Sequence, residues 1–283
     1  HLFFAVSIVS TTGLAPANFA ESYNFGGQII SLLFIQLGGI GYMALGSFII
    51  IRQFDKLPKI SMKLLRFEFS PPKRYPLLPF LYSVFIFTVL IECIGAIILY
   101  FGFKDAGVDD PLWFAIFHSI SAFCTAGFSL GQNSLVDFND YPLIINTITI
   151  LSLLGSIGFI VLLDFIISIR KWENKISLST KIIVVSTFIM LLSGTLVLYF
   201  SDAEFFNQGT EGLKLALFQT MTAHTTVGFN SYDIGSFSPS ILLILIILMI
   251  IGASPAGTGG GIKTTSITTL YAVTKAILLR RKE

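Results

Sequence analysis

Three short stretches of the sequence place threonine and glycine at the point where an apolar segment stops. They are VSTTGLAP at 9–16, FCTAGFSL at 123–130 and TTVGFNSY at 225–232. Backbone carbonyls can replace the water shell of a cation when several converge on one axis. Successive carbonyls point the same way only if one residue adopts backbone angles that L-residues avoid, and glycine does so without steric cost. The stretches predict three carbonyl-lined loops along a cation pathway; the alternative is a tight loop that packs two helices.

The composition indicates that these loops belong to an integral membrane protein. The 283-residue chain is 54% hydrophobic and 12% charged, with a mean hydropathy of +0.82. Soluble domains usually carry about 25% charged residues, and a helix that crosses a membrane needs about 20 mostly apolar residues. A formal net charge of +2 is too small to indicate nucleic-acid binding. We predict membrane spans at 28–51, 77–101, 142–169, 178–200 and 241–279.

The charged residues are segregated between the segments that connect these spans. Cytoplasmic loops of membrane proteins carry an excess of Lys and Arg. We therefore predict that the basic segments are cytoplasmic and the acidic segments external, in a multi-pass protein of the cell membrane. The basic segments are 52–74, 170–181 and the tail with Arg280, Arg281 and Lys282; the acidic ones are 10–27, 102–141 and 201–240.

Two of the external segments contain apolar stretches that are too short to cross. The segment 102–141 begins and ends outside, yet it holds PLWFAIFHSISAFC at 111–124. Fourteen residues of helix reach about 21 Å, less than the roughly 30 Å of a bilayer core. The stretch LKLALFQTMTAH at 213–224 follows the same logic. Both are predicted to be re-entrant helices, each followed by a glycine loop buried in protein or lined by water.

The pattern of span, short helix, glycine loop and span repeats along the chain. A second glycine motif follows each loop: LGGIG at 37–41, LGSIG at 154–158 and IGASP at 251–255. We predict three units around one axis: the end of a first repeat at 1–56, a second at 57–170 and a third at 171–283. The opening helix of the first repeat and a whole fourth repeat are expected to be missing from this chain.

The stretch GASPAGTGGG at 252–261 interrupts the last span. Five glycines and a proline in ten residues cannot hold a helix, and small residues in a broken membrane helix are typical of ion pathways. A displaceable barrier below the loops is the favoured reading, and a packing kink is the alternative. A phosphate loop is excluded because Ile262 stands where that motif requires glycine. Lys263 either repels cations or extends to the cytoplasmic face.

The sequence resembles the potassium-translocating subunits of the Ktr/Trk/HKT superfamily, most closely the bacterial KtrB type. Four stretches carry the resemblance: VSTTGLAP, AFCTAGFS, TTVGFN and IGASPAGTGGGIKTT. The resemblance covers nearly the whole chain. It implies an all-α membrane fold of helix–pore loop–helix units, arranged pseudo-fourfold around a central pore. The filter glycines of the family match Gly13, Gly127 and Gly228, and its gate loop matches Gly252 through Lys263.

The resemblance also implies a function and partners. The function is potassium uptake, often sodium-dependent. The partners are membrane lipid, a second copy in a homodimer and a cytosolic nucleotide-binding ring of the KtrA/TrkA type, so a nucleotide is expected only in that partner. No cofactor is expected in this chain. Filter residues are predicted to be Ser10, Thr11, Thr12, Gly13, Leu14, Cys124, Thr125, Ala126, Gly127, Phe128, Thr225, Thr226, Val227, Gly228 and Phe229, and gate residues Gly252, Ala253, Ser254, Pro255, Gly257, Thr258, Gly259, Gly260, Gly261 and Lys263.

Two alternative functions stay open at this point. One is a sodium-selective or sodium/potassium-cotransporting relative; in the plant branch of the superfamily, serine in place of the first filter glycine accompanies sodium preference, and here that residue is Gly13. The other is a membrane-embedded enzyme or structural subunit. A hydrolase would need a nucleophile and a base, and Ser254 with Lys263 is the only pair that the loop offers. Glu92, an acid within a predicted span, is either functional or hydrogen-bonded to a neighbouring helix.

Overall fold

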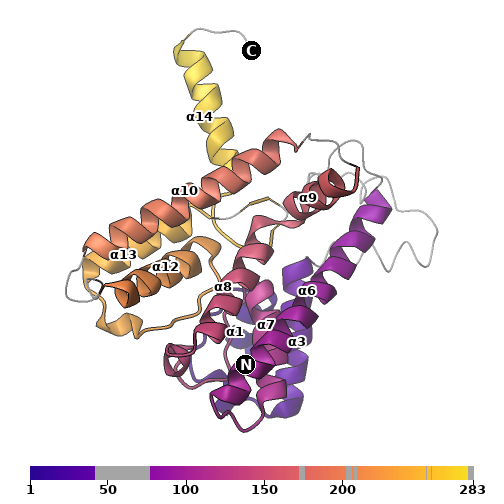
Figure 1. Cartoon of the computed structure of the whole chain (residues 1–283), viewed down its shortest axis with the longest axis vertical. Coiled ribbons are helices and arrows are strands. Elements are labelled where there is room, and N and C mark those ends of the chain that lie inside the picture. Colours follow the sequence, from indigo (N-terminus) through magenta and orange to yellow (C-terminus); the bar gives the residue numbers. More distant parts are fainter. Residues whose placement is uncertain are drawn as a thin grey trace.

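The described part of the chain is built from helices, two of them long and the others short, and some of the short ones lie at the centre of the bundle (Figure 1). The computed structural model describes residues 1–41, 77–171, 176–201, 206, 209–252, 254–255 and 257–279. The predicted basic segment 52–74, the basic tail and Ala253 lie outside the described residues, as do the ends of the predicted spans beyond them.

The elements follow the predicted alternation of spans and short helices. In order they are α1 (Leu2–Val9), α2 (Phe19–Ser22), α3 (Phe25–Ile40), α6 (Leu77–Asp105), α7 (Pro111–Phe123), η1 (Val136–Phe138), α8 (Pro142–Ile157), α9 (Phe159–Lys171), α10 (Leu178–Ser201), α12 (Thr210–Thr225), η2 (Ile234–Ser236), α13 (Pro239–Ile250) and α14 (Thr264–Leu278). The described residues contain no β-strand, and the predicted all-α class is confirmed.

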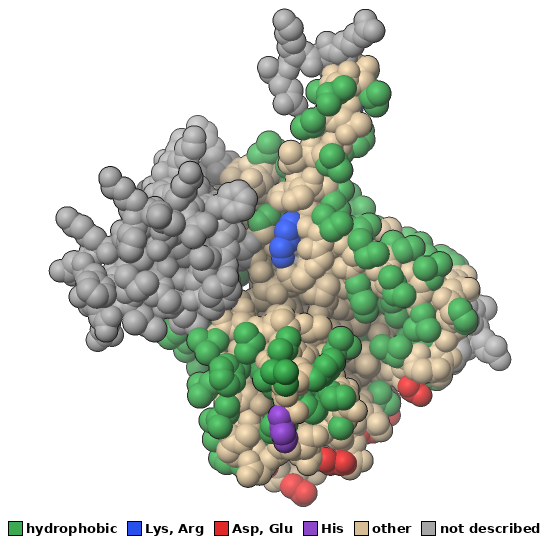
Figure 2. Space-filling view, turned by 180° about the vertical axis from the view of Figure 1, so that it is seen from behind, with side chains coloured by type: hydrophobic (Ala, Val, Ile, Leu, Met, Phe, Trp, Pro, Cys, Tyr) green, Lys and Arg blue, Asp and Glu red, His purple; other side chains and the backbone are tan. Residues whose placement is uncertain are grey.

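The long helices present large apolar side chains outward. Within the described residues, Leu81–Asp105 of α6 and Leu178–Ser201 of α10 are each long and apolar enough to cross a membrane. Ile86 of α6 and Phe188 of α10 are 63% and 65% exposed. Figure 2 shows hydrophobic side chains spread over one face of the molecule. Such a surface is unfavourable in water and favourable in lipid, so the helices face the bilayer.

The short helices occupy the centre of the bundle. α7 packs against α3, α6 and α8, while α12 packs against α8, α10 and α13. Phe117 and Phe123 of α7 and Met221 of α12 are fully buried. The side chain of Asp110 accepts a hydrogen bond from the Trp113 amide and Pro111 stands at the first turn, so α7 begins with two strong start signals. The buried position of α7 and α12 is what holds the loops that follow them inside the protein.

The predicted span 142–169 is not one unbroken helix. α8 ends at Ile157 and α9 begins at Phe159, and the two helices are bent by 94° at Gly158. Gly158 has φ 92° and ψ 152°, and Gly41 at the end of α3 has nearly the same φ, 90°. These angles lie outside the helical region and favour glycine. The second glycine motif therefore marks helix ends, and α8 with α9 crosses the membrane only as a broken pair.

The last predicted span is interrupted where the glycine-rich stretch stands. α13 ends at Ile250, α14 begins at Thr264, and the described residues between them form no helix. α14 projects from the rest of the chain (Figure 1). The prediction of a break inside 241–279 is confirmed.

Candidate functional site

The three threonine–glycine loops meet at one place in the fold. A Cβ atom added to Gly13 would lie 2.6 Å from the carbonyl oxygen of Ala126 and 3.5 Å from that of Val227. A Cβ on Gly127 would also collide with the Val227 carbonyl. A Cβ on Gly228 would meet no described atom within 4 Å, so the group of loops is open on that side. The loops are brought together although they are far apart in the sequence.

Each loop has left-handed backbone angles at two positions rather than at the one that the sequence predicted. The glycines have φ of 77°, 67° and 86° at Gly13, Gly127 and Gly228. The threonine two residues earlier is also left-handed in every loop, with φ of 49°, 51° and 59° at Thr11, Thr125 and Thr226. A β-branched residue with positive φ is a genuine outlier, and such strain persists only where the surroundings hold it. The recurrence of Thr two residues before Gly is the sequence signal for this feature.

The threonine hydroxyls brace two of the loops. Thr11 donates to the carbonyl of Ser10, and Thr125 donates to the carbonyl of Cys124, both at 2.8 Å. In the third loop, the Thr226 hydroxyl instead accepts the amide hydrogen of Gly260, at 2.7 Å. Threonine thus fixes the backbone of its own loop in two cases. In the third loop it instead accepts a hydrogen bond from the glycine-rich loop between α13 and α14.

A second set of hydroxyls ties the short helices to the loops that follow them. Ser121 donates to the carbonyl of Phe128 and Thr222 donates to the carbonyl of Phe229, each at 2.8 Å and each across seven residues. Phe128 and Phe229 were predicted filter residues, but these bonds direct their carbonyl oxygens at the short helix. The prediction overlooked the hydroxyls, although Ser7, Ser121 and Thr222 stand six residues before the three glycines.

Burial differs between the loops. The second and third loops are enclosed: Cys124, Thr125, Ala126, Phe128, Thr225, Val227 and Phe229 are buried. In the first loop Ser10, Thr12 and Leu14 are exposed, Leu14 to 61%. A cavity of about 290 Å³ opens on the three glycines and is also lined by Asn18, Gln132 and Asn230. It provides a polar approach to the point where the loops meet.

The glycine-rich loop lies against the ends of the short helices. Thr258 donates its hydroxyl to the carbonyl of Phe123 at 3.0 Å and its amide to Gly155 at 3.0 Å. The amide of Ser254 donates to Ser156 at 3.3 Å. With the Gly260–Thr226 bond, these contacts attach residues 254–260 to α7, to the end of α8 and to the third loop. Sequence reasoning placed the break correctly but did not find these partners.

The side chains of this loop bear on the alternative of a hydrolase. Ser254 donates its hydroxyl to the carbonyl of Pro255, and Lys263 donates its ammonium to the carbonyl of Gly259. The two side chains therefore do not form the nucleophile–base pair that a hydrolase needs.

His224 lies near the end of α12, before the third loop. Its Nδ1 forms a hydrogen bond of 3.0 Å with the carbonyl oxygen of Ile251, where α13 ends.

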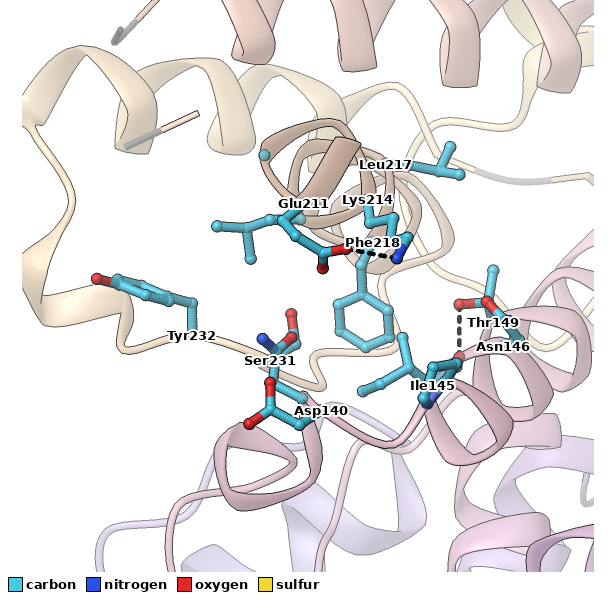
Figure 3. A pocket seen from close by; sticks show the side chains of 14 residues that line it. Asp140, Ile145, Asn146, Thr149, Glu211, Lys214, Leu217, Phe218, Ser231 and Tyr232 are labelled. Carbon is cyan, nitrogen blue, oxygen red and sulfur yellow. Dashed lines mark hydrogen bonds and ion pairs between the residues drawn. The ribbon is translucent and has the colours of Figure 1, made fainter. Parts of the chain in front are cut away.

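A larger pocket of about 470 Å³ lies away from the loops. It is formed between the N-terminal ends of α8 and α12, and Figure 3 shows Asp140, Phe218 and Tyr232 around it. Its charged pair, Glu211 and Lys214, is joined at 2.7 Å and exposed to solvent. None of the predicted site residues lines this pocket. In the part of the chain that the structure describes, no three His, Cys, Asp or Glu side chains are grouped to hold a metal ion.

Comparisons with known proteins agree with this architecture. The chain is 32% identical to the Ktr system potassium uptake protein B of Vibrio alginolyticus over 286 residues, which cover 99% of this chain and 63% of that protein. It is 32% identical to the protein of the same name in Bacillus subtilis, covering 100% of this chain and 64% of the relative. It is 31% identical to the potassium/sodium uptake protein NtpJ of Enterococcus hirae, covering 94% and 59%. The chain therefore spans about 63% of the length of the first of these relatives.

The structural comparison gives the same fold. The crystal structure of the potassium transporter TrkH from Vibrio parahaemolyticus matches with a TM-score of 0.68 at 19% identity, covering 99% of this chain and 56% of that one. The family model TrkH, described as a cation transport protein, matches residues 1–282. The chain belongs to the TrkH family of cation transport proteins.

Proposed function

We propose that the protein takes up potassium ions across the cytoplasmic membrane through a filter of backbone carbonyls at residues 10–14, 124–127 and 225–228. The observation that carries the proposal is the meeting of three loops with the same pair of left-handed residues. Alternating handedness turns successive carbonyls to one side, where they can replace the hydration shell of a potassium ion. The C-terminal ends of α7 and α12 add partial negative charge at the same place.

The loop of residues 252–263 is the proposed gate. Its attachment directly at the filter supports this role, because Thr258 and Gly260 bond to the helix and loop ends that hold the filter. A chain segment in this place obstructs an ion that leaves the filter, and its displacement requires only a few hydrogen bonds to break. Lys263 braces the loop through the carbonyl of Gly259.

The wider assembly is proposed from the open side of the loop group and from the names of the relatives. The open side at Gly228 supports a fourth glycine loop from outside this chain. Relatives named as parts of a Ktr system support a transporter with more than one component. We propose a homodimer on a cytosolic nucleotide-binding ring, with the basic segments 52–74 and 170–181 and the tail on the cytoplasmic side of the membrane.

A sodium-carrying protein is the second candidate, because one relative is named a potassium/sodium uptake protein. Gly13 in the first loop favours potassium. Uptake of Rb⁺ and Na⁺ by the purified full-length protein in liposomes would decide between them: potassium selectivity predicts that Rb⁺ enters faster at equal concentration, and equal or faster entry of Na⁺ would contradict it.

The filter role is tested by growth of a potassium-uptake-deficient bacterium at low potassium. The full-length protein should restore growth, and a Gly228→Asp variant should not, because φ of 86° strains any side chain and a carboxylate would bind the ion too tightly to release it. Gly107→Asp is the matched control: Gly107 also has positive φ, 72°, with no described atom within 4 Å of an added Cβ, but it lies outside the loops.

The two variants separate a filter effect from a general effect of strain. Growth with Gly107→Asp and none with Gly228→Asp, at equal membrane levels, supports the filter. Normal growth with Gly228→Asp contradicts it.

A further inference from the structure

A carboxyl group lies buried in the apolar interior next to the second loop. Glu92 is on α6 and is only 6% exposed. The side-chain amide of Gln36, on α3, donates a hydrogen bond of 2.9 Å to Glu92 Oε2. A buried polar group without such a partner is costly, and an acid inside a membrane helix indicates a function more often than an accident. The pair joins two helices that belong to different predicted repeats.

The same pair contacts the first residue of the second loop. Cys124 Sγ lies 3.6 Å from Gln36 Oε1 and 3.7 Å from Glu92 Oε1, and Cys124 is fully buried. Cys124 caps the end of α7 and immediately precedes Thr125, which is left-handed. The thiol therefore connects the carboxyl group to the backbone of the predicted filter.

Neighbouring contacts leave Cys124 little freedom to move. A Cβ on Gly39 of α3 would lie 2.5 Å from Cys124 Sγ, so α3 presses on the thiol from another direction. Ser119 of α7 donates its hydroxyl to the backbone carbonyl of Glu92 at 2.7 Å, which fixes α7 against α6. α3 and α6 together hold the start of the second loop.

The corresponding residues of the other loops lack such an external anchor. Ser10 in the first loop donates to the carbonyl of Val6, and Thr225 in the third donates to that of Met221, both within their own short helix. Among the described residues, only the second loop is held by an ionisable side chain, the Glu92 carboxyl group, from another helix. This difference argues against a general packing role that every loop would need.

We propose that Glu92 is a positioning residue of the second filter loop, which it holds through Gln36 and the Cys124 thiol so that potassium is distinguished from sodium. The inference rests on the proposed function. Discrimination by carbonyls depends on how many of them contact the ion and how firmly they are held. Loss of the anchor relaxes the carbonyls of residues 124–126 and admits the smaller ion.

The test is selective ion uptake by the full-length protein in liposomes, measured with Rb⁺ and Na⁺. Glu92→Leu removes both hydrogen bonds and should raise the Na⁺/Rb⁺ uptake ratio about fivefold, the factor that corresponds to one net hydrogen bond. Glu92→Gln keeps an acceptor for Gln36 and should restore most of the wild-type ratio. Thr88→Val is the matched control, because Thr88 is one turn away on α6, fully buried and without a hydrogen-bond partner among the described residues; its ratio should equal that of the wild type.

A second measurement covers the case in which Glu92→Leu does not fold. Cys124→Ala removes the thiol while the Gln36–Glu92 pair is kept, and it should raise the ratio in the same direction. Combining Cys124→Ala with Glu92→Gln should add no further change, because both act through one contact.

Each of the following outcomes would overturn the inference. An unchanged ratio in folded Glu92→Leu, or in Cys124→Ala, excludes positioning through the thiol. A ratio in Glu92→Gln as high as in Glu92→Leu shows that the charge itself matters and not the hydrogen bonds. A wild-type protein that carries no Rb⁺ contradicts the proposed function and this inference with it, whereas a selective wild type with an unaffected Glu92→Leu variant contradicts the inference alone.

Discussion

At the scale of single residues, hydroxyl groups decide how firmly each loop is held. Ser121 and Thr222 each bond to a carbonyl of the loop that follows their helix. The corresponding Ser7 is buried, yet its hydroxyl has no partner among the described residues. The first loop is also the most exposed, as Leu14 shows. The second and third loops are therefore the rigid part of the site.

We expect Thr222→Val, which keeps the shape of the side chain and removes its hydroxyl, to loosen the third loop. The loss of one net hydrogen bond costs about 1 kcal/mol, and the Na⁺/Rb⁺ uptake ratio should rise several-fold. Thr220→Val on the same helix is the control, since Thr220 is fully buried and its hydroxyl has no hydrogen-bond partner in the part of the chain that the structure describes. Equal ratios for the two variants would show that the bond to Phe229 does not support the filter.

At the scale of elements, glycine allows helices to approach the short helices and their threonine–glycine loops closely. A Cβ on Gly38 of α3 would collide with the carbonyl of Val9, and one on Gly155 of α8 would collide with the carbonyl of Phe123. Val9 and Phe123 both end a short helix four residues before a filter glycine. The second glycine motif thus serves two purposes, close packing at its first glycine and the helix end at its last.

The loop between α13 and α14 supplies the prediction at this scale. Thr258→Val removes the hydroxyl bond to Phe123 but keeps the backbone bond to Gly155. If the loop closes the pathway, a looser loop should raise Rb⁺ uptake several-fold in liposomes without any regulatory partner. Thr264→Val is the control, because Thr264 begins α14, is buried and finds no hydrogen-bond partner for its hydroxyl within the described ranges. Reduced uptake in Thr258→Val would mean that the bond supports the open pathway instead.

At the scale of the whole molecule, the long helices set which side of the membrane each loop reaches. α6 has 29 residues, or about 44 Å at 1.5 Å per residue, so its two ends lie on opposite sides of a core of about 30 Å. α7 enters from the side where α6 ends and returns there through the second loop. The acidic segment around Asp109 is therefore expected outside, and the basic segment around Lys181 inside.

Labelling of single cysteines tests this orientation in whole cells. In a Cys93→Ser background, Asp109→Cys should react with a membrane-impermeant maleimide added from outside, whereas Lys181→Cys should react only after permeabilisation. Both positions are exposed and Cys124 is buried, so the native thiol should stay silent. Labelling of Lys181→Cys in intact cells would show that the orientation is the opposite of the predicted one.

Much of this architecture could be predicted from local patterns. The short apolar stretches before Gly127 and Gly228 are α7 and α12, and the glycine-rich stretch interrupts the last span. These features are visible in the sequence because each depends on residues that are close together along the chain: the length of an apolar run, a cluster of glycines, or a group of like charges. The break within the span 142–169 was not predicted because an apolar run looks the same whether or not one glycine within it turns the chain by 94°.

The sequence alone determined the membrane class, the short helices and the residue types of the three loops, since each follows from composition or from spacing along the chain. Only the tertiary structure decided that the loops meet, that Thr258 and Gly260 attach the broken helix to them, and that Glu92 and Gln36 both contact the Cys124 thiol. Those contacts join residues from helices far apart in the chain, and side-chain hydrogen bonds of a few ångströms leave no periodic trace in the sequence.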